Sequence, residues 1–176
     1  MTVTDDIARI ARDAKSLLCE LQPMADMWTP TAHVVTDEGR HVATLLDPDL
    51  LDTPTMAGLQ VRLEVAPSGV AVAAVICESY VKRTDTITGA LMAHAGGLAD
   101  EYATDPATDV VRALVIVSCT AQGVHSLRLL PYAWNDQGAP VWLDHTDIAD
   151  TLMAAGVGAQ VVALAEAIAG VEEVAP

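Results

Sequence analysis

Two stretches of the chain are apolar on both sides of an extended strand, and they constrain the fold more than any other feature. In Gly69–Val81 (GVAVAAVICESYV), small and branched apolar residues occupy odd and even positions alike. Val110–Cys119 (VVRALVIVSC) behaves in the same way. β-branched residues dominate both runs, and each has the length of a long strand, which favours strands over buried helices. A strand with two apolar faces must be covered on both, so the rest of the chain has to supply that cover.

The first half of the chain contains two segments with the apolar spacing of helices. One is predicted from about Asp5 to Gln22, with Thr4 as its cap and Asp5 in its first turn. The other is predicted to begin near Pro54 and to end before Pro67. The core-facing seam that we expect for this second helix consists of Met56, Leu59 and Leu63.

The remaining elements are predicted as strands and one last helix. A hairpin is expected from Ala32–Thr36 and Arg40–Leu46, and two later strands from Val124–Pro131 and Ala139–Leu143. Their turns carry glycine or asparagine, as hairpin turns do. A C-terminal helix is predicted to start at Asp144 or Thr146, with Ile148 at the beginning of its apolar seam and Ile168 near the end.

This order of elements predicts an α+β fold. We expect a mainly antiparallel five- to six-stranded sheet with an N-terminal helix, a middle helix and a C-terminal helix. Residues 1–170 are predicted to form a single globular domain and residues 171–176 a frayed tail. The connection 84–109 is rich in glycine and polar residues, and we expect its part Gly96–Asp109 to be the internal segment most sensitive to protease.

Composition excludes several classes of function. The 176 residues include 24 acidic and 9 basic ones, for a net charge of −15, which opposes binding to nucleic acid or to anionic lipid. No apolar run reaches the ~18 uninterrupted residues of a membrane span, and the N-terminus lacks the pattern of a secretion signal. Cys19, Cys77 and Cys119 are few and widely spaced, as expected for free thiols in a reducing compartment. We therefore expect a cytoplasmic protein.

A cysteine–histidine pair is the strongest catalytic candidate in the sequence. The common phosphate-binding, dinucleotide-binding, zincin and hydrolase motifs are absent. Cys77 is followed by Glu78, and His125 begins a strand that is expected nearby. A nucleophilic thiolate needs a histidine beside it and an acid to orient that histidine. The alternative is a buried Cys77, an exposed His125 and a Glu78 that is solvated or paired.

A metal site is the second candidate. His145, Asp147 and Asp150 lie close together around a predicted helix start, and His41 or His94 would complete the shell. Imidazole and carboxylate ligands suit zinc or manganese. Helix capping explains Asp147 without any metal, so no cofactor is predicted.

These observations favour a non-enzymatic protein-binding or assembly protein of unknown pathway. Two alternatives are a small enzyme that uses one of the sites above and an acidic inhibitor that mimics a polyanion. Trp134 and Trp142 flank one turn and form a candidate aromatic patch for a protein partner. A hydrophobic fraction of 52% further predicts a homodimer, with Val161, Leu164 and Ile168 of the last helix at its interface.

Overall fold

The structure is a computed structural model that describes residues 2–21, 29–47, 52–66, 68–82, 110–143, 146–148 and 159–171. The predicted protease-sensitive connection and nearly all of the predicted tail lie outside these ranges. The helices and strands are α1 (Val3–Leu21), β1 (Thr31–Thr36), β2 (His41–Leu45), α2 (Pro54–Val65), β3 (Val70–Lys82), β4 (Val110–Thr120), β5 (Gly123–Trp134), β6 (Pro140–Trp142), β7 (Thr146–Ile148) and α6 (Ala159–Ala169).

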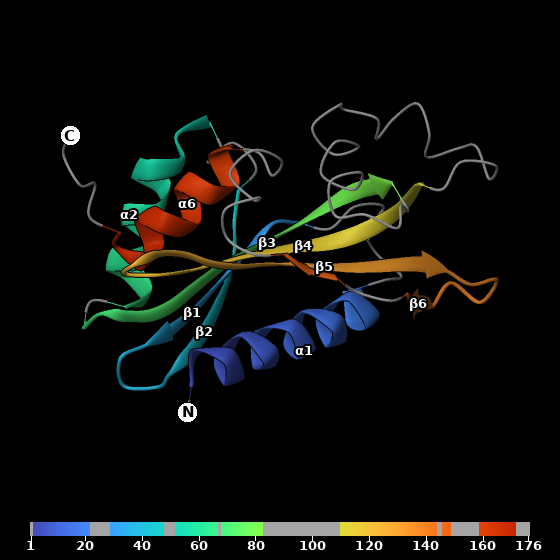
Figure 1. The fold of residues 1–176 in the computed structure, drawn as a ribbon, viewed down its shortest axis with the longest axis horizontal. Helices are drawn as coiled ribbons and strands as arrows, with labels where there is room; N and C mark the ends of the chain where they lie inside the picture. The colour runs from blue at the N-terminus through green and yellow to red at the C-terminus, as the bar shows by residue number, and fades with distance from the viewer. Residues whose placement is uncertain are drawn as a thin grey trace.

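The strands form one antiparallel sheet in the order β2-β1-β3-β4-β5-β6, and β7 also pairs with β5. The helix α1 covers one face of this sheet, and α2 and α6 cover the other (Figure 1). The predicted α+β fold with an N-terminal, a middle and a C-terminal helix is confirmed. Within the described residues the sheet has seven strands, because β7 adds one to the five or six that we expected.

The two strands that are apolar on both faces form the centre of the sheet, as predicted. Their register pairs Val75 with Val117 and Ile76 with Ile116, and both faces are buried. One core layer lies between the sheet and α2/α6, and the other lies between the sheet and α1. Six side chains of these two strands are at most 1% exposed: Val72, Val75, Ile76, Leu114, Val115 and Ile116.

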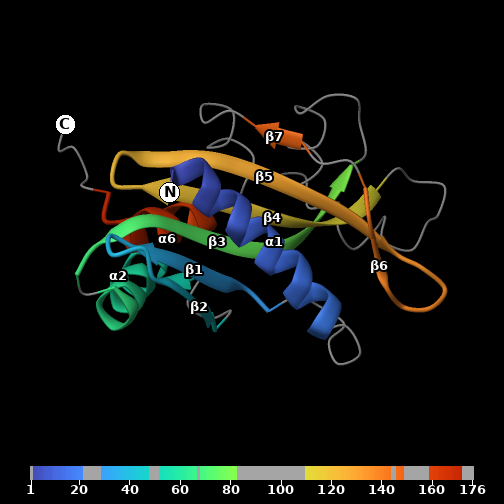
Figure 2. The same cartoon turned by 90° about the horizontal axis from the view of Figure 1, so that it is seen from below.

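The helix α1 begins earlier than the sequence indicated. Its cap is Thr2 rather than the predicted Thr4: the Asp5 backbone N–H donates to Thr2 Oγ1 (3.2 Å), and the Thr2 N–H donates to Asp5 Oδ2 (2.9 Å). These reciprocal hydrogen bonds satisfy two N–H groups at the helix start. The Asp5 carboxylate accepts from the backbone N–H and from the hydroxyl of Thr2, and both bonds lower the pKa of Asp5. Figure 2 shows α1 lying obliquely across the strands.

The predicted start of the C-terminal helix is wrong. Thr146–Ile148 forms β7, and the helix α6 begins at Ala159 instead. The physical reason lies in β5, because β6 pairs only with Tyr132–Trp134 and leaves Leu127–Leu129 with an open edge. Backbone groups of β7 complete that edge, and this long-range pairing outweighs the local capping pattern.

Candidate functional site

The helix α2 packs against α6 through its smallest residues. Ala57, Gly58 and Val61 are buried. A Cβ atom at Gly58 would lie 2.6 Å from Ala167 Cβ and 2.8 Å from the Leu164 carbonyl oxygen, closer than packed atoms allow. Gly58 therefore lets the two helix backbones approach closely, and it decides which face of α2 turns inward.

The seam that we predicted to face the core is consequently exposed. Met56 is 68% exposed, Leu59 41% and Leu63 73%. These residues follow each other at i, i+3 and i+7, so they form one stripe along the outer side of the helix. The prediction of a buried seam is wrong because α2 is apolar on two opposite sides. The side with the smaller residues, Ala57, Gly58 and Val61, packs against α6 instead. We call Met56, Leu59 and Leu63 the α2 stripe.

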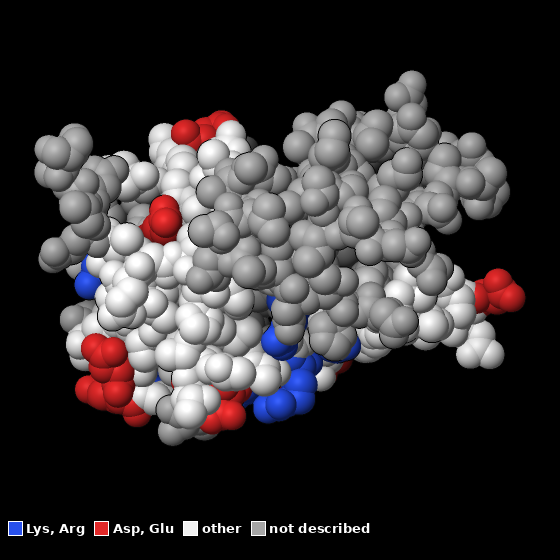
Figure 3. Space-filling view, viewed as in Figure 1, with Lys and Arg blue, Asp and Glu red and all other residues white. Residues whose placement is uncertain are grey.

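Few charged groups border the α2 stripe. Glu64 is exposed on one flank and accepts a hydrogen bond from Gln60 (3.0 Å). Arg62, on the other flank, directs its guanidinium to the chain at Gly170, and Arg40 donates to the Val65 carbonyl oxygen (2.9 Å). Figure 3 shows a mostly uncharged surface over α2 and α6, with scattered acidic residues.

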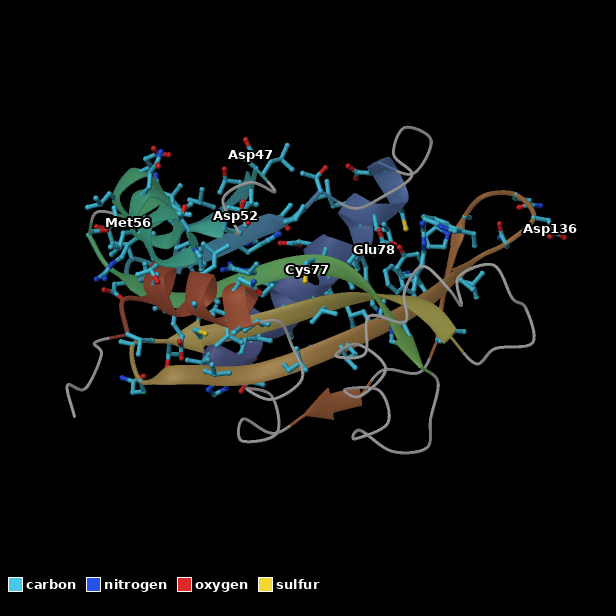
Figure 4. All side chains as sticks on the ribbon, turned by 90° about the horizontal axis from the view of Figure 1, so that it is seen from above. Asp47, Asp52, Met56, Cys77, Glu78 and Asp136 are labelled. Atoms are coloured by element: carbon cyan, nitrogen blue, oxygen red, sulfur yellow. The ribbon has the colours of Figure 1, made fainter. Side chains whose placement is uncertain are left out.

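Acidic residues lie beyond the N-terminal end of the α2 stripe. Asp47 and Asp52 are both exposed. Figure 4 shows them on the same side of the molecule as Met56, while Asp136 lies at the opposite end, in the turn between β5 and β6. The stripe is thus an apolar surface with exposed carboxylates before its N-terminal end and on one flank, while Arg40 is exposed near its C-terminal end.

A second polar arrangement connects α1 to the edge of the sheet. His41 Nδ1 lies 3.2 Å from Asp13 Oδ2, and His41 Nε2 lies 3.1 Å from His33 Nδ1. An ionised carboxylate only accepts hydrogen bonds, so His41 donates through Nδ1 and, when neutral, accepts at Nε2. His33 then donates through Nδ1, and its Nε2 carries a free lone pair.

Both rings of this arrangement, the Asp13–His41–His33 chain, are neutral near pH 7. The pKa of His33 is lowered to about 4, chiefly by burial and to a lesser extent by the neighbouring His41, while Asp13 opposes this change. Burial also lowers the pKa of His41, although Asp13 opposes this change. His33 is only 2% exposed, and its Nε2 is buried without a hydrogen-bond partner. The chain has the order of a proton relay, but the described residues leave its terminal nitrogen enclosed beneath α1.

The candidate catalytic residue Glu78 is held in a polar cluster on the α1 side of the sheet. The Tyr132 hydroxyl donates to Glu78 Oε1, and Arg112 Nε lies 3.4 Å from the same oxygen. Burial, followed by the effect of Glu78, raises the pKa of Tyr132. The carboxylate is therefore paired from two sides, which matches the structural alternative considered for it.

The aromatic hairpin packs around that same tyrosine. The ring centroids of Trp134 and Trp142 lie 5.2 Å and 5.5 Å from that of Tyr132. Lys15 Nζ, from α1, lies 4.8 Å from the centroid of Trp142. Both tryptophans are half-buried against the α1 layer of the core, so part of each ring stabilises the fold.

The structure does not bring Cys77 and His125 together. Cys77 is in register with Val115, which in turn pairs with Leu129, four residues beyond His125 and about 13 Å along the strand. His125 is exposed. Cys77 faces the α2/α6 layer, opposite to its neighbour Glu78, and burial raises the pKa of its thiol to about 12. The described geometry provides neither a thiolate nor a base for it.

The predicted metal ligands are only partly described. His94, His145 and Asp150 lie outside the described residues. Asp147 belongs to β7, whereas His41 belongs to β2 at the opposite edge of the sheet, five strand spacings or about 24 Å away (Figure 2). Within the described residues, no three or more His, Cys, Asp or Glu side chains are placed so that they could hold one metal ion. His41 therefore does not complete a shell with Asp147.

The residues predicted for a subunit interface are buried in the chain's own core. Leu164 and Ile168 are 0% exposed and Val161 is 9% exposed, between α2 and the sheet. They are not accessible to a second chain. The sequence pattern identified correctly that this helix is buried, but its cover comes from α2.

Comparisons with known proteins add no relative. No family model, no curated protein and no solved structure matched the chain. None of the helices in the described ranges combines the length and apolar content that a membrane span requires.

Proposed function

We propose that this chain is a non-enzymatic protein-binding or assembly protein and that the α2 stripe is its docking surface. One observation carries the proposal: Met56, Leu59 and Leu63 are 41–73% exposed on the side of α2 opposite to its packed face. Single exposed leucines are ordinary on protein surfaces. A continuous apolar stripe with the spacing of a helix–helix seam is typical of a surface that another protein covers.

The charge of the chain supports a protein as the partner. A net charge of −15 disfavours nucleic acid, whose binding requires clusters of lysine and arginine. The carboxylates near the stripe, Asp52 and Glu64, disfavour an anionic lipid surface for the same reason. We propose a cytoplasmic protein whose partner presents apolar side chains to α2.

A small enzyme is the second candidate, and the Asp13–His41–His33 chain is the observation that favours it. A carboxylate that orients a histidine is a common way to prepare a base. The enclosed position of His33 argues for a structural role, because a general base must come within hydrogen-bond reach of its substrate. The α2 stripe needs no rearrangement to be accessible, which is why we place binding first.

Site-specific photocrosslinking in cells that express the chain tests the proposed function. A photoreactive residue at Leu63 is expected to form an adduct with one protein, identified by mass spectrometry, and Met56→Asp should abolish it. The matched control places the same group at Glu38, which is exposed in the turn between β1 and β2. Equal labelling at both positions, or no adduct at Leu63, would contradict the proposal.

A further inference from the structure

We propose that the α2 stripe is covered by a second copy of this chain, with the two α2 helices packed antiparallel about a two-fold axis beside Leu59. This inference rests on the proposed function and names the partner for the same surface. It differs from the interface that the sequence suggested, because the residues of α6 are buried within one chain.

The stripe is complementary to itself in the antiparallel direction. Met56, Leu59 and Leu63 have the i, i+3, i+7 spacing of a seam in which two helices interlock their side chains. The midpoint between Met56 and Leu63 falls beside Leu59. A two-fold axis at this point places Leu59 against the partner's Leu59 and each Met56 level with the partner's Leu63. Each copy therefore supplies the cover that the other lacks.

Charges on the flanks of the stripe agree with this arrangement. Reversal about the same midpoint brings Glu64 level with the partner's Thr55, so no two carboxylates of α2 face each other. Arg62 is engaged at Gly170 and leaves the seam free. Antiparallel helices also oppose their macrodipoles. The net charge of −15 per chain acts against association, but salt screens it beyond about 10 Å at 0.1 M.

The size of the contact predicts how strong it is. The 12 residues of α2 extend about 18 Å, and a standard interface buries about 800 Å² on each partner. Three apolar residues per chain supply only the centre of such an interface. We therefore expect a dimer that dissociates on dilution, and light scattering over a range of protein concentrations is the suitable measurement.

Complementary charges at the two-fold axis provide the decisive experiment. The unaltered protein should approach twice the chain mass of 18.4 kDa at high concentration. Leu59→Glu and Leu59→Lys should each be monomeric, because like charges would meet across the axis, and their equimolar mixture should dimerise again. The matched controls, Ser16→Glu and Ser16→Lys, alter an exposed position of α1 and should dimerise alone. Circular dichroism checks that every variant is folded.

Direct crosslinking tests the antiparallel direction. With Cys19 replaced by serine to remove an exposed thiol, Met56→Cys mixed with Leu63→Cys should form a disulfide-linked dimer faster than either variant alone. Faster linkage within Met56→Cys alone would overturn the antiparallel arrangement.

The two proposals fail separately. Suppose that the chain stays monomeric at high concentration and that the adduct at Leu63 contains a different protein. This result would refute the homodimer, but it would agree with the proposed protein-binding function. A dimer that survives both Leu59 variants also overturns this inference. If the chain is monomeric and the photoreactive group at Leu63 also forms no adduct with any protein, both the homodimer and the proposed protein-binding function are refuted.

Discussion

The helices α1 and α2 lie on opposite faces of one sheet, yet they differ in how far their large apolar side chains are buried. Helix α1 has one apolar face, and its large side chains Ile7, Ile10 and Leu18 are at most 5% exposed. Helix α2 has two, and it buries Ala57 and Gly58 while its largest apolar residues remain outside. A helix with one apolar face has one way to dock, whereas a helix with two must have its orientation chosen by its neighbour.

The two layers also differ in polarity. The α1 layer contains the Asp13–His41–His33 chain and the pair of Glu78 and Arg112. Buried side-chain atoms without a partner occur there as well, and among the described residues they are Arg9 Nε, Thr31 Oγ1, His33 Nε2 and Ser118 Oγ. The α2/α6 layer is apolar instead, and most of its buried residues are alanine or valine. The first layer should therefore respond to pH and the second to changes in side-chain volume.

The largest expected effect comes from the buried face of α1. Ile10→Ala should lower the free energy of unfolding by about 2–5 kcal/mol, because it leaves a cavity where Ile10 is 0% exposed. The matched change on α2, Leu63→Ala, should stay within about 0.5 kcal/mol at protein concentrations that keep the chain monomeric. Urea denaturation measures both, and equal losses would contradict the different roles of these faces.

Acid should weaken the α1 layer next. The folded-state pKa of His33 is about 4, below the unfolded value of 6.5, so the unfolded chain binds this proton more readily. Stability should therefore fall as the pH decreases from about 6.5 to about 4, with His33 contributing up to about 3 kcal/mol. His33→Leu should flatten this part of the profile, and parallel profiles for the two proteins would exclude the assignment.

Side-chain volume should govern the α2/α6 layer. Gly58→Ala is expected to destabilise the protein by about 1–3 kcal/mol, because its Cβ would press on Ala167 and on the Leu164 carbonyl oxygen. The same change inside an exposed helix normally stabilises by up to about 1 kcal/mol. Gln60→Ala, on the exposed side of α2, is the control. A gain in melting temperature for Gly58→Ala would refute the close approach.

The smallest effect is expected where α1 contacts the aromatic hairpin. Lys15→Gln removes the cation next to Trp142 and should cost about 0.5–1 kcal/mol. Lys15→Arg keeps the charge and should cost less. Denaturation followed by tryptophan fluorescence measures the difference, and identical stability of the two variants would show that the contact contributes nothing.

The candidate site was visible in the sequence only in part. Met56, Leu59 and Leu63 were identified as a seam, but the pattern did not reveal that the seam faces outward. His41 was identified only as a candidate metal ligand, and Asp13 and His33 only as polar residues of a helix and of an outer strand. The contacts between these three side chains depend on the register of β1 with β2 and on the path of α1 across the sheet. The spacing of residues along the sequence predicts neither of these.

The sequence by itself determined the elements whose signals are local. Strands with two apolar faces had to lie at the centre of the sheet. The helix α1 has a single apolar face, so it had to pack on the sheet through that face. Gly39 (φ 81°) supplied the turn between β1 and β2. Tertiary structure decided the pairing of β7 and the orientation of α2. Periodicity shows that a helix has an apolar face, but the choice between two such faces depends on how closely a neighbour can pack. Gly58 against Ala167 made that choice, and it left the α2 stripe exposed.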